Sequence, residues 1–121
     1  MAAESPPPES LLPLPTATFH ILMAVADDDR HGYGIIQEIA SRTGGEIRMS
    51  AGTLYRSIQR MIDQDLIVEV HERPAPEFDD ERRRYYRITK FGTAVARAEV
   101  RRLQELVRLA RASGFKPRNA S

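Results

Sequence analysis

Residues 50–60 read Ser-Ala-Gly-Thr-Leu-Tyr-Arg-Ser-Ile-Gln-Arg, and this stretch decides the fold. Ser50 is typical of a helix N-cap, where a side-chain oxygen accepts a hydrogen bond from one of the first backbone N–H groups. Apolar residues then recur at spacings of three and four, which predicts an amphipathic helix over 50–63. Its inner face consists of Leu54, Ile58, Met61 and Ile62.

The outer face of this helix is polar and basic. It carries Gly52, Arg56, Gln59 and Arg60, with Thr53 and Tyr55 on its flanks. In the DNA major groove, arginine bonds guanine bidentately and glutamine bonds adenine. We therefore predict base contacts from Arg56 and Gln59 with Arg60 beside them, and phosphate contacts from the hydroxyl groups of Ser50, Thr53 and Tyr55. The alternatives are that Arg56 and Gln59 form a solvated surface pair, and that the Tyr55 ring only covers the core.

Length and composition bound the class of protein. A chain of 121 residues with 41% apolar content has room for one small domain with a modest core. The absence of cysteine excludes disulfides and thiolate metal sites and fits a cytoplasmic location. No apolar run approaches the roughly 18 residues of a membrane span, so we expect no membrane partner.

Charge is distributed unevenly along the chain, although the net charge is only +1. Residues 1–81 contain 6 of the 18 basic residues and 15 of the 17 acidic ones. The basic excess therefore lies in residues 82–121, which suggests that this part contacts a polyanion. The alternative is a long helix with a solvated basic face.

The order of the predicted elements indicates the fold class. A Pro-rich leader without packing demands covers 1–13, and a flexible tail covers 113–121. Between them we predict helices over 16–26 and 33–43, a very short strand at 46–49, the helix over 50–63, strands over 67–71 and 83–88, and a last helix over 89–112. Three helices followed by a two-stranded hairpin describe a mainly α winged helix-turn-helix domain over 14–90.

The last helix has a second apolar pattern. Ala96, Val100, Leu103, Val107 and Ala110 alternate at spacings of four and three, and Leu106 and Leu109 widen this seam. A helix of this length, about 35 Å, overhangs so small a domain. We therefore predict a two-fold homodimer that sets two DNA-reading helices about 34–36 Å apart. The predicted dimerisation residues are Phe19, Leu22, Val100, Leu103, Leu106, Val107 and Ala110. The alternative is that the seam packs only on its own domain.

Three sequence signatures resemble the PadR family of bacterial transcriptional regulators. They are His31-Gly32-Tyr33-Gly34-Ile35, the segment 50–56 and the segment 80–92, and the resemblance extends over about 12–112. It implies a dimeric DNA-binding protein, most often a repressor, and many members release DNA when they bind a small molecule. The sequence identifies no ligand class for such an inducer. Two positions depart from the family pattern: Ala51 stands where proline is usual, and Asp65 stands where glycine is common.

Several other residues have predicted roles at the DNA. Tyr33 could bond a phosphate or only pack, while Arg82, Arg83 and Arg84 lie where the wing can reach phosphates or the minor groove. We expect at least one of these arginines to pair with Asp79, Asp80 or Glu81.

The histidines His20, His31 and His71 lack metal-ligand spacing, so we predict no metal, cofactor or catalytic residue. The overall prediction is a homodimeric repressor that binds an inverted-repeat operator. The alternative is a winged-helix module that binds protein and not DNA.

Overall fold

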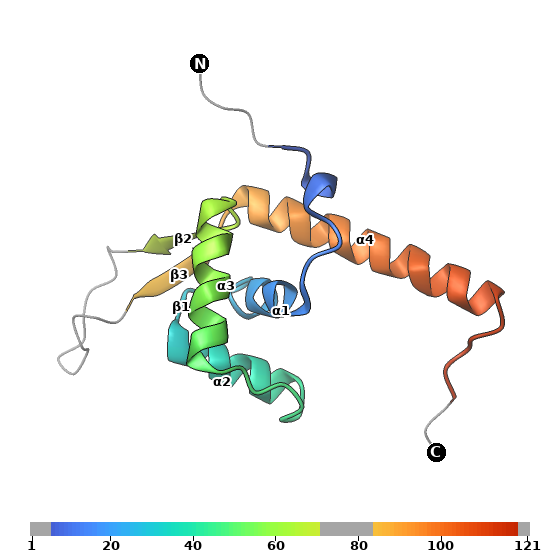
Figure 1. Cartoon of the computed structure of the whole chain (residues 1–121), viewed down its shortest axis with the longest axis horizontal. Helices are drawn as coiled ribbons and strands as arrows, with labels where there is room; N and C mark the ends of the chain where they lie inside the picture. The colour runs from blue at the N-terminus through green and yellow to red at the C-terminus, as the bar shows by residue number, and fades with distance from the viewer. Residues whose placement is uncertain (1–5, 71–83, 119–121) are drawn as a thin grey trace.

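The computed structural model describes residues 6–70 and 84–118. The elements are η1 (Pro8–Leu11), α1 (Thr16–Ala24), β1 (Arg30–His31), α2 (Gly32–Arg42), α3 (Ala51–Asp63), β2 (Ile67–Val70), β3 (Tyr85–Ile88) and α4 (Lys90–Ala112). In Figure 1 the helices α1, α2 and α3 pack together beside a small sheet, and α4 runs out past them. This arrangement confirms the predicted winged helix-turn-helix with a long last helix.

Side-chain caps begin three of the helices. The Ser50 Oγ accepts a hydrogen bond from the Thr53 N–H at 3.2 Å, and the Thr89 Oγ1 accepts one from the Gly92 N–H at 2.8 Å. Both caps are as predicted. The His31 Nδ1 caps α2 in the same way, accepting from the Gly34 N–H at 3.0 Å. Each cap satisfies one backbone donor that the helix itself leaves unpaired.

The sheet has three strands in the described residues, in the order β1-β3-β2, and all pairs are antiparallel. Arg30 pairs with Tyr86, and Ile67 pairs with Ile88. The predicted two-stranded hairpin is confirmed as β2 and β3, and the sheet adds β1, which the sequence did not predict because two residues are too few to show an alternating pattern. The strand predicted at 46–49 is wrong, since these residues have no regular structure.

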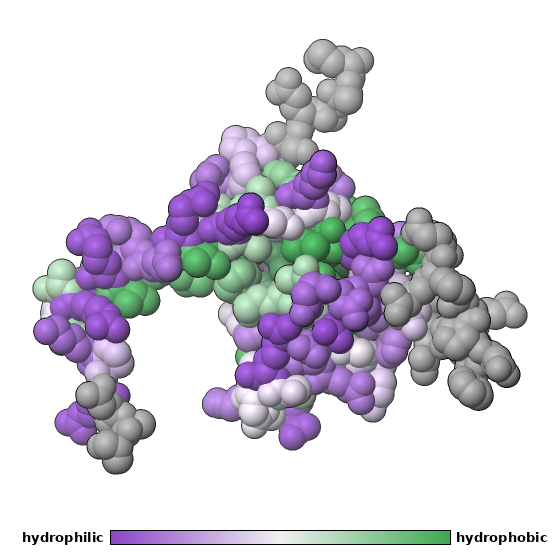
Figure 2. All heavy atoms as spheres, turned by 180° about the vertical axis from the view of Figure 1, so that it is seen from behind, coloured by the Kyte–Doolittle hydropathy of each residue, from purple (hydrophilic) through white to green (hydrophobic). Residues whose placement is uncertain are grey.

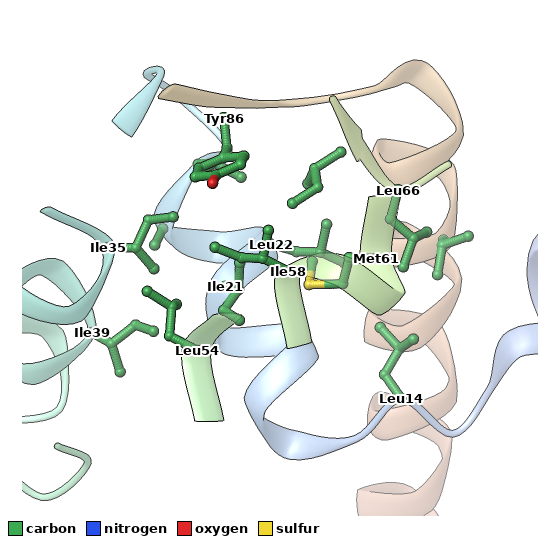
Figure 3. Close-up of a cluster of buried hydrophobic side chains, with 14 residues drawn as sticks. Leu14, Ile21, Leu22, Ile35, Ile39, Leu54, Ile58, Met61, Leu66 and Tyr86 are labelled. Carbon is green, nitrogen blue, oxygen red and sulfur yellow. The ribbon is translucent and has the colours of Figure 1, made fainter. Parts of the chain in front are cut away.

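A single apolar core joins the helices with β2 and β3. Figure 3 shows side chains from the three bundled helices converging beneath Tyr86, which reaches in from β3. The fully buried members include Ile21, Leu22, Ile35, Leu54, Met61, Leu66, Ile67 and Val95. Each such side chain contributes about 1.5–3 kcal/mol when it leaves water, so α3 is held firmly against its neighbours.

Leu22 is one of these core residues, which corrects its predicted place at a dimer surface. Its side chain is 0% exposed within a single protomer and has no surface to offer a partner. The reason is that α1 is covered on several sides, by α2, α3 and α4. Phe19, from the same helix, is only partly buried against the core.

The segment before α1 also differs from the sequence-based expectation. Residues 8–13 do not behave as an unpacked leader, because η1 packs against α4. Leu11 and Leu12 pack against the core, and Leu14 is 9% exposed within it. The Pro-rich composition of the segment suggested a leader without packing demands, but these three leucines give it an apolar side that packs. Within the described ranges, no helix is both long and apolar enough to cross a membrane.

Candidate nucleic-acid interface

Helix α3 has one buried and one exposed face, as its spacing predicts. Leu54, Ile58 and Met61 are at most 3% exposed. The opposite face presents the exposed side chains Tyr55, Arg56, Gln59 and Arg60. Because the buried face fixes the orientation of the helix, these polar groups point outward from a rigid element.

The start of α3 carries a short chain of polar contacts. The Ser50 hydroxyl donates to the Thr53 Oγ1 at 3.1 Å, and the Arg56 Nη2 approaches the same oxygen at 3.5 Å. Gly52 leaves room for this arginine, since a Cβ there would lie 3.3 Å from the Arg56 Nη1. The Arg56 guanidinium is therefore drawn toward the helix start while the residue remains exposed.

The start of α2 meets α3 and the sheet at one point. A Cβ on Gly32 would overlap the Tyr55 hydroxyl oxygen, so glycine is what allows the Tyr55 ring to cross the start of α2. The neighbouring His31 contacts the Tyr85 ring edge-on, with ring centroids 5.4 Å apart. These contacts bring Tyr33 and Tyr55, 64% and 50% exposed, onto one surface.

A hollow of about 500 Å³ lies between the start of α2, one side of α3 and the sheet. Its lining includes four residues predicted to contact DNA, namely Tyr33, Tyr55, Gln59 and Arg84. Tyr86 closes the hollow from the core side, and burial raises the pKa of its hydroxyl, with further increases from nearby Tyr55 and Glu69. Tyr86 therefore stays a neutral phenol at physiological pH.

Two ion pairs shape the charge around this surface. Arg84, exposed just before β3, has its Nε 3.5 Å from the Glu69 carboxylate on β2. Asp29 accepts two hydrogen bonds from Arg87, at 3.0 and 2.8 Å, which neutralises part of the acidic turn before β1. Sequence spacing could not reveal this second pair, because its members are 58 residues apart.

Not every predicted contact residue can be placed. Arg82 and Arg83 lie outside the described residues, as do the predicted ion-pair partners Asp79, Asp80 and Glu81. The other predicted DNA-contact residues all lie in α2, α3 or the sheet or beside them. Among the described side chains, no group of three or more His, Asp or Glu is placed to hold a metal ion.

Comparison with known proteins shows a relative that is similar in sequence. The curated Uncharacterized protein X of Lysinibacillus sphaericus is 36% identical over 74 residues, which are 61% of this chain. The match spans 65% of the length of that relative.

Solved structures share the fold. A PadR family transcription regulator from Clostridium difficile R20291 has a TM-score of 0.68 at 20% identity, over 81% of this chain and 97% of that one. Bacillus subtilis PadR, solved in complex with operator DNA, has a TM-score of 0.54 at 12% identity, over 88% and 52% of the two chains. Residues 21–98 match the profile of the transcriptional regulator PadR-like family, and the chain belongs to that family.

Proposed function

We propose that the protein is a dimeric transcriptional repressor that binds an inverted-repeat operator in double-stranded DNA. The observation that carries the proposal is the outward face of α3, whose Tyr55 and Gln59 line one hollow together with Tyr33 and Arg84. In Figure 1 α3 crosses the front of the view with the sheet beside it. The similarity to Bacillus subtilis PadR, solved with operator DNA, supports the same mode of binding.

In this proposal α3 enters the major groove. Arg56 and Gln59 contact base edges with Arg60 beside them, because their side chains are exposed on the helix face opposite the core. The hydroxyl groups at the starts of α2 and α3 contact phosphates on either side of the groove. These groups belong to Tyr33, Ser50, Thr53 and Tyr55. Arg84, with Arg82 and Arg83, contacts the backbone or minor groove beside it.

The dimer is proposed from the apolar surface of α4. Val100, Leu106, Val107 and Leu109 are 44–52% exposed in the single protomer. Figure 2 shows hydrophobic residues continuing along α4 toward its far end, between hydrophilic ones. A second copy related by a two-fold axis would cover this surface, with contributions from Phe19, Leu103 and Ala110. A small-molecule inducer, as the family resemblance implies, would act by lowering the affinity of this dimer for its operator.

The proposal is tested by selecting operator fragments from genomic DNA and measuring their affinity by fluorescence anisotropy. We expect an enriched inverted repeat, and an affinity whose logarithm falls linearly with the logarithm of salt concentration between about 50 and 200 mM. A winged-helix module that binds protein would enrich no motif and show no such slope. That result would exclude the proposed function.

Two variants distinguish base-specific contacts from contacts with the phosphate backbone. Arg56→Ala is expected to reduce the preference for operator over scrambled DNA by about 1–3 kcal/mol. Arg84→Ala is expected to weaken both DNAs alike, because a phosphate contact carries no sequence information. Lys116→Ala, an exposed cation beyond α4, serves as the control and should bind as the wild type does. If Arg56→Ala lowered the affinity for operator and for scrambled DNA equally, the proposed base contact of Arg56 would be contradicted.

A further inference from the structure

Glu99 is an acidic residue in the middle of α4, and it is only 2% exposed. Its Oε1 accepts a hydrogen bond from the Arg102 Nε at 2.6 Å. Its Oε2 accepts from the Arg102 Nη2 at 3.0 Å and from the backbone N–H of Leu14 at 3.2 Å. One buried carboxylate therefore joins α4 to a segment 85 residues earlier in the chain.

Packing alone does not explain an acid at this position. A buried carboxylate loses its hydration, and an apolar side chain of similar size often stabilises a fold as well or better. A carboxylate supplies something that leucine cannot, namely directional acceptors for a particular N–H group and a particular guanidinium. Glu99 thus fixes where Leu14 and Arg102 lie relative to α4.

The start of α4 is fixed independently. The Thr89 hydroxyl lies 2.6 Å from the Asp65 carbonyl oxygen and 3.1 Å from that of Leu66. Gly92 lies directly against the Leu66 carbonyl, since a Cβ there would overlap this oxygen. Gly92 and Glu99 are seven residues apart, or about 10 Å along the helix. Two anchors at this separation define the direction of the helix axis.

Beyond these anchors α4 leaves the body of the molecule. Figure 1 shows η1 lying across α4 near its middle and the remaining turns projecting past it. From Glu99 to Ala112 the helix extends about 20 Å. A tilt of about 10° at the anchors would move its far end by about 3.4 Å, which equals the rise of one base pair.

We propose that Glu99 and the N-terminal strap, residues 8–14, set the direction of α4 and thereby the spacing of the two α3 helices in the dimer. Glu99 is a positioning residue in this role, and it touches no DNA. The proposal rests on the proposed function for its consequence at the operator. Its structural part, the fixed direction of α4, can be measured without DNA.

The direction of α4 is tested by distance measurement between spin labels. Because the chain has no cysteine, Gln37→Cys on α2 and Arg111→Cys on α4 provide two unique labelling sites, both exposed. Labelled protein is mixed with excess unlabelled protein, so that one protomer of each dimer is observed. We expect a narrow distance distribution in the wild type and a distribution at least about twice as broad in Glu99→Gln.

The matched control is Glu105→Gln. Glu105 pairs with Arg108 at 2.7 Å at the same spacing of three residues, but this pair is exposed on the projecting part of α4. We expect this variant to keep the narrow distribution. If Glu99→Gln fails to fold by circular dichroism, Leu11→Ala, which loosens the strap, is measured in its place with the same expectation. A folded Glu99→Gln or Leu11→Ala protein with the wild-type distribution would overturn the proposal.

The consequence for DNA is tested with operators whose half-site spacing is changed by one or two base pairs. We expect the wild type and Glu105→Gln to prefer the selected spacing by about tenfold or more, equal to about 1.4 kcal/mol. Glu99→Gln should lose most of this preference while binding an isolated half-site as the wild type does. Unchanged spacing preference in Glu99→Gln would overturn the proposal. Failure of the wild type to bind any operator would refute the proposed function instead. The distances between the spin labels would still test whether Glu99 fixes the direction of α4.

Discussion

Asp65 shows how a single residue can carry strain. It follows α3 with a φ of 64°, in the left-handed region that a residue with a Cβ adopts at a cost of about 1–2 kcal/mol. Glycine enters this region without that cost, although it loses more conformational entropy on folding. Asp65 is also one of the two positions at which the sequence departs from the family pattern. The Asp65 carbonyl accepts a hydrogen bond from the Thr89 hydroxyl.

Two substitutions of Asp65 should therefore change the free energy of unfolding in opposite directions. Asp65→Gly is expected to raise the free energy of unfolding by about 0.5–1 kcal/mol, because relief of strain exceeds the added entropy of the unfolded chain. Asp65→Ala should lower it by about 0.5 kcal/mol, since alanine lacks the polar group that helps aspartate tolerate this region. Urea denaturation at constant m-value measures both. A glycine variant less stable than the alanine variant would contradict this account.

Glu99 makes stability depend on pH. The hydrogen bonds from Arg102 lower the pKa of its carboxyl group; burial opposes this, and the Leu14 N–H lowers the pKa further. A carboxyl group whose pKa is lower in the folded state stabilises the fold above its unfolded pKa, about 4.3 for glutamate. This contribution is lost as the pH falls through the lowered pKa.

Glu99→Gln is accordingly expected to cost about 1–3 kcal/mol at pH 7, and the difference from wild type should shrink as the pH falls below about 4. Urea unfolding at a series of pH values measures the difference. Glu105→Gln should differ little from wild type at any pH, because an exposed pair is screened by solvent. A difference for Glu99→Gln that persists undiminished in acid would argue against an ionic contribution.

At the scale of elements, the joint between the sheet and α4 depends on the absence of a side chain. Gly92→Ala would press a Cβ into the Leu66 carbonyl, which belongs to backbone and cannot move aside cheaply. We expect a loss of about 1–3 kcal/mol and a lower midpoint of thermal unfolding.

Gly52→Ala is the control, as it also lies in the first turn of a helix but meets only the mobile end of Arg56. Because alanine has a higher helix propensity than glycine, this substitution should leave the free energy of unfolding unchanged or raise it by up to about 1 kcal/mol. Equal effects of the two substitutions would show that α4 does not depend on close contact at Gly92.

At the scale of the whole molecule, α4 presents more apolar surface than a single protomer covers. Val107→Asp would place a charge within the exposed seam, at 51% exposure, without touching the core. We expect the proposed dimer to weaken by at least about tenfold, given about 1.5–3 kcal/mol for each buried aliphatic side chain. Light scattering after size exclusion would then show monomer at concentrations where the wild type is dimeric.

Gln104→Glu, exposed on α4 outside the seam, should remain dimeric. The Val107→Asp monomer should also lose operator affinity, because its two half-sites would no longer be bound as one unit. A Val107→Asp protein that stays dimeric would place the dimer interface elsewhere.

Local spacing in the sequence determined much of this molecule. It predicted α3 and α4, the caps at Ser50 and Thr89, and the division of α3 into a buried and an exposed face. These features depend on neighbours three and four residues away, and such neighbours meet in any helix. For the same reason, spacing alone identifies Tyr55, Arg56 and Gln59 as residues that point outward.

Tertiary structure alone decided the rest. It placed Leu22 in the core, gave β1 a partner strand, packed Tyr55 across Gly32 and buried Glu99 against Leu14. Each of these facts joins segments far apart in the chain, and no periodicity along one segment records which other segment will cover it. The direction of α4, on which the spacing of a dimer would depend, comes from such long-range contacts.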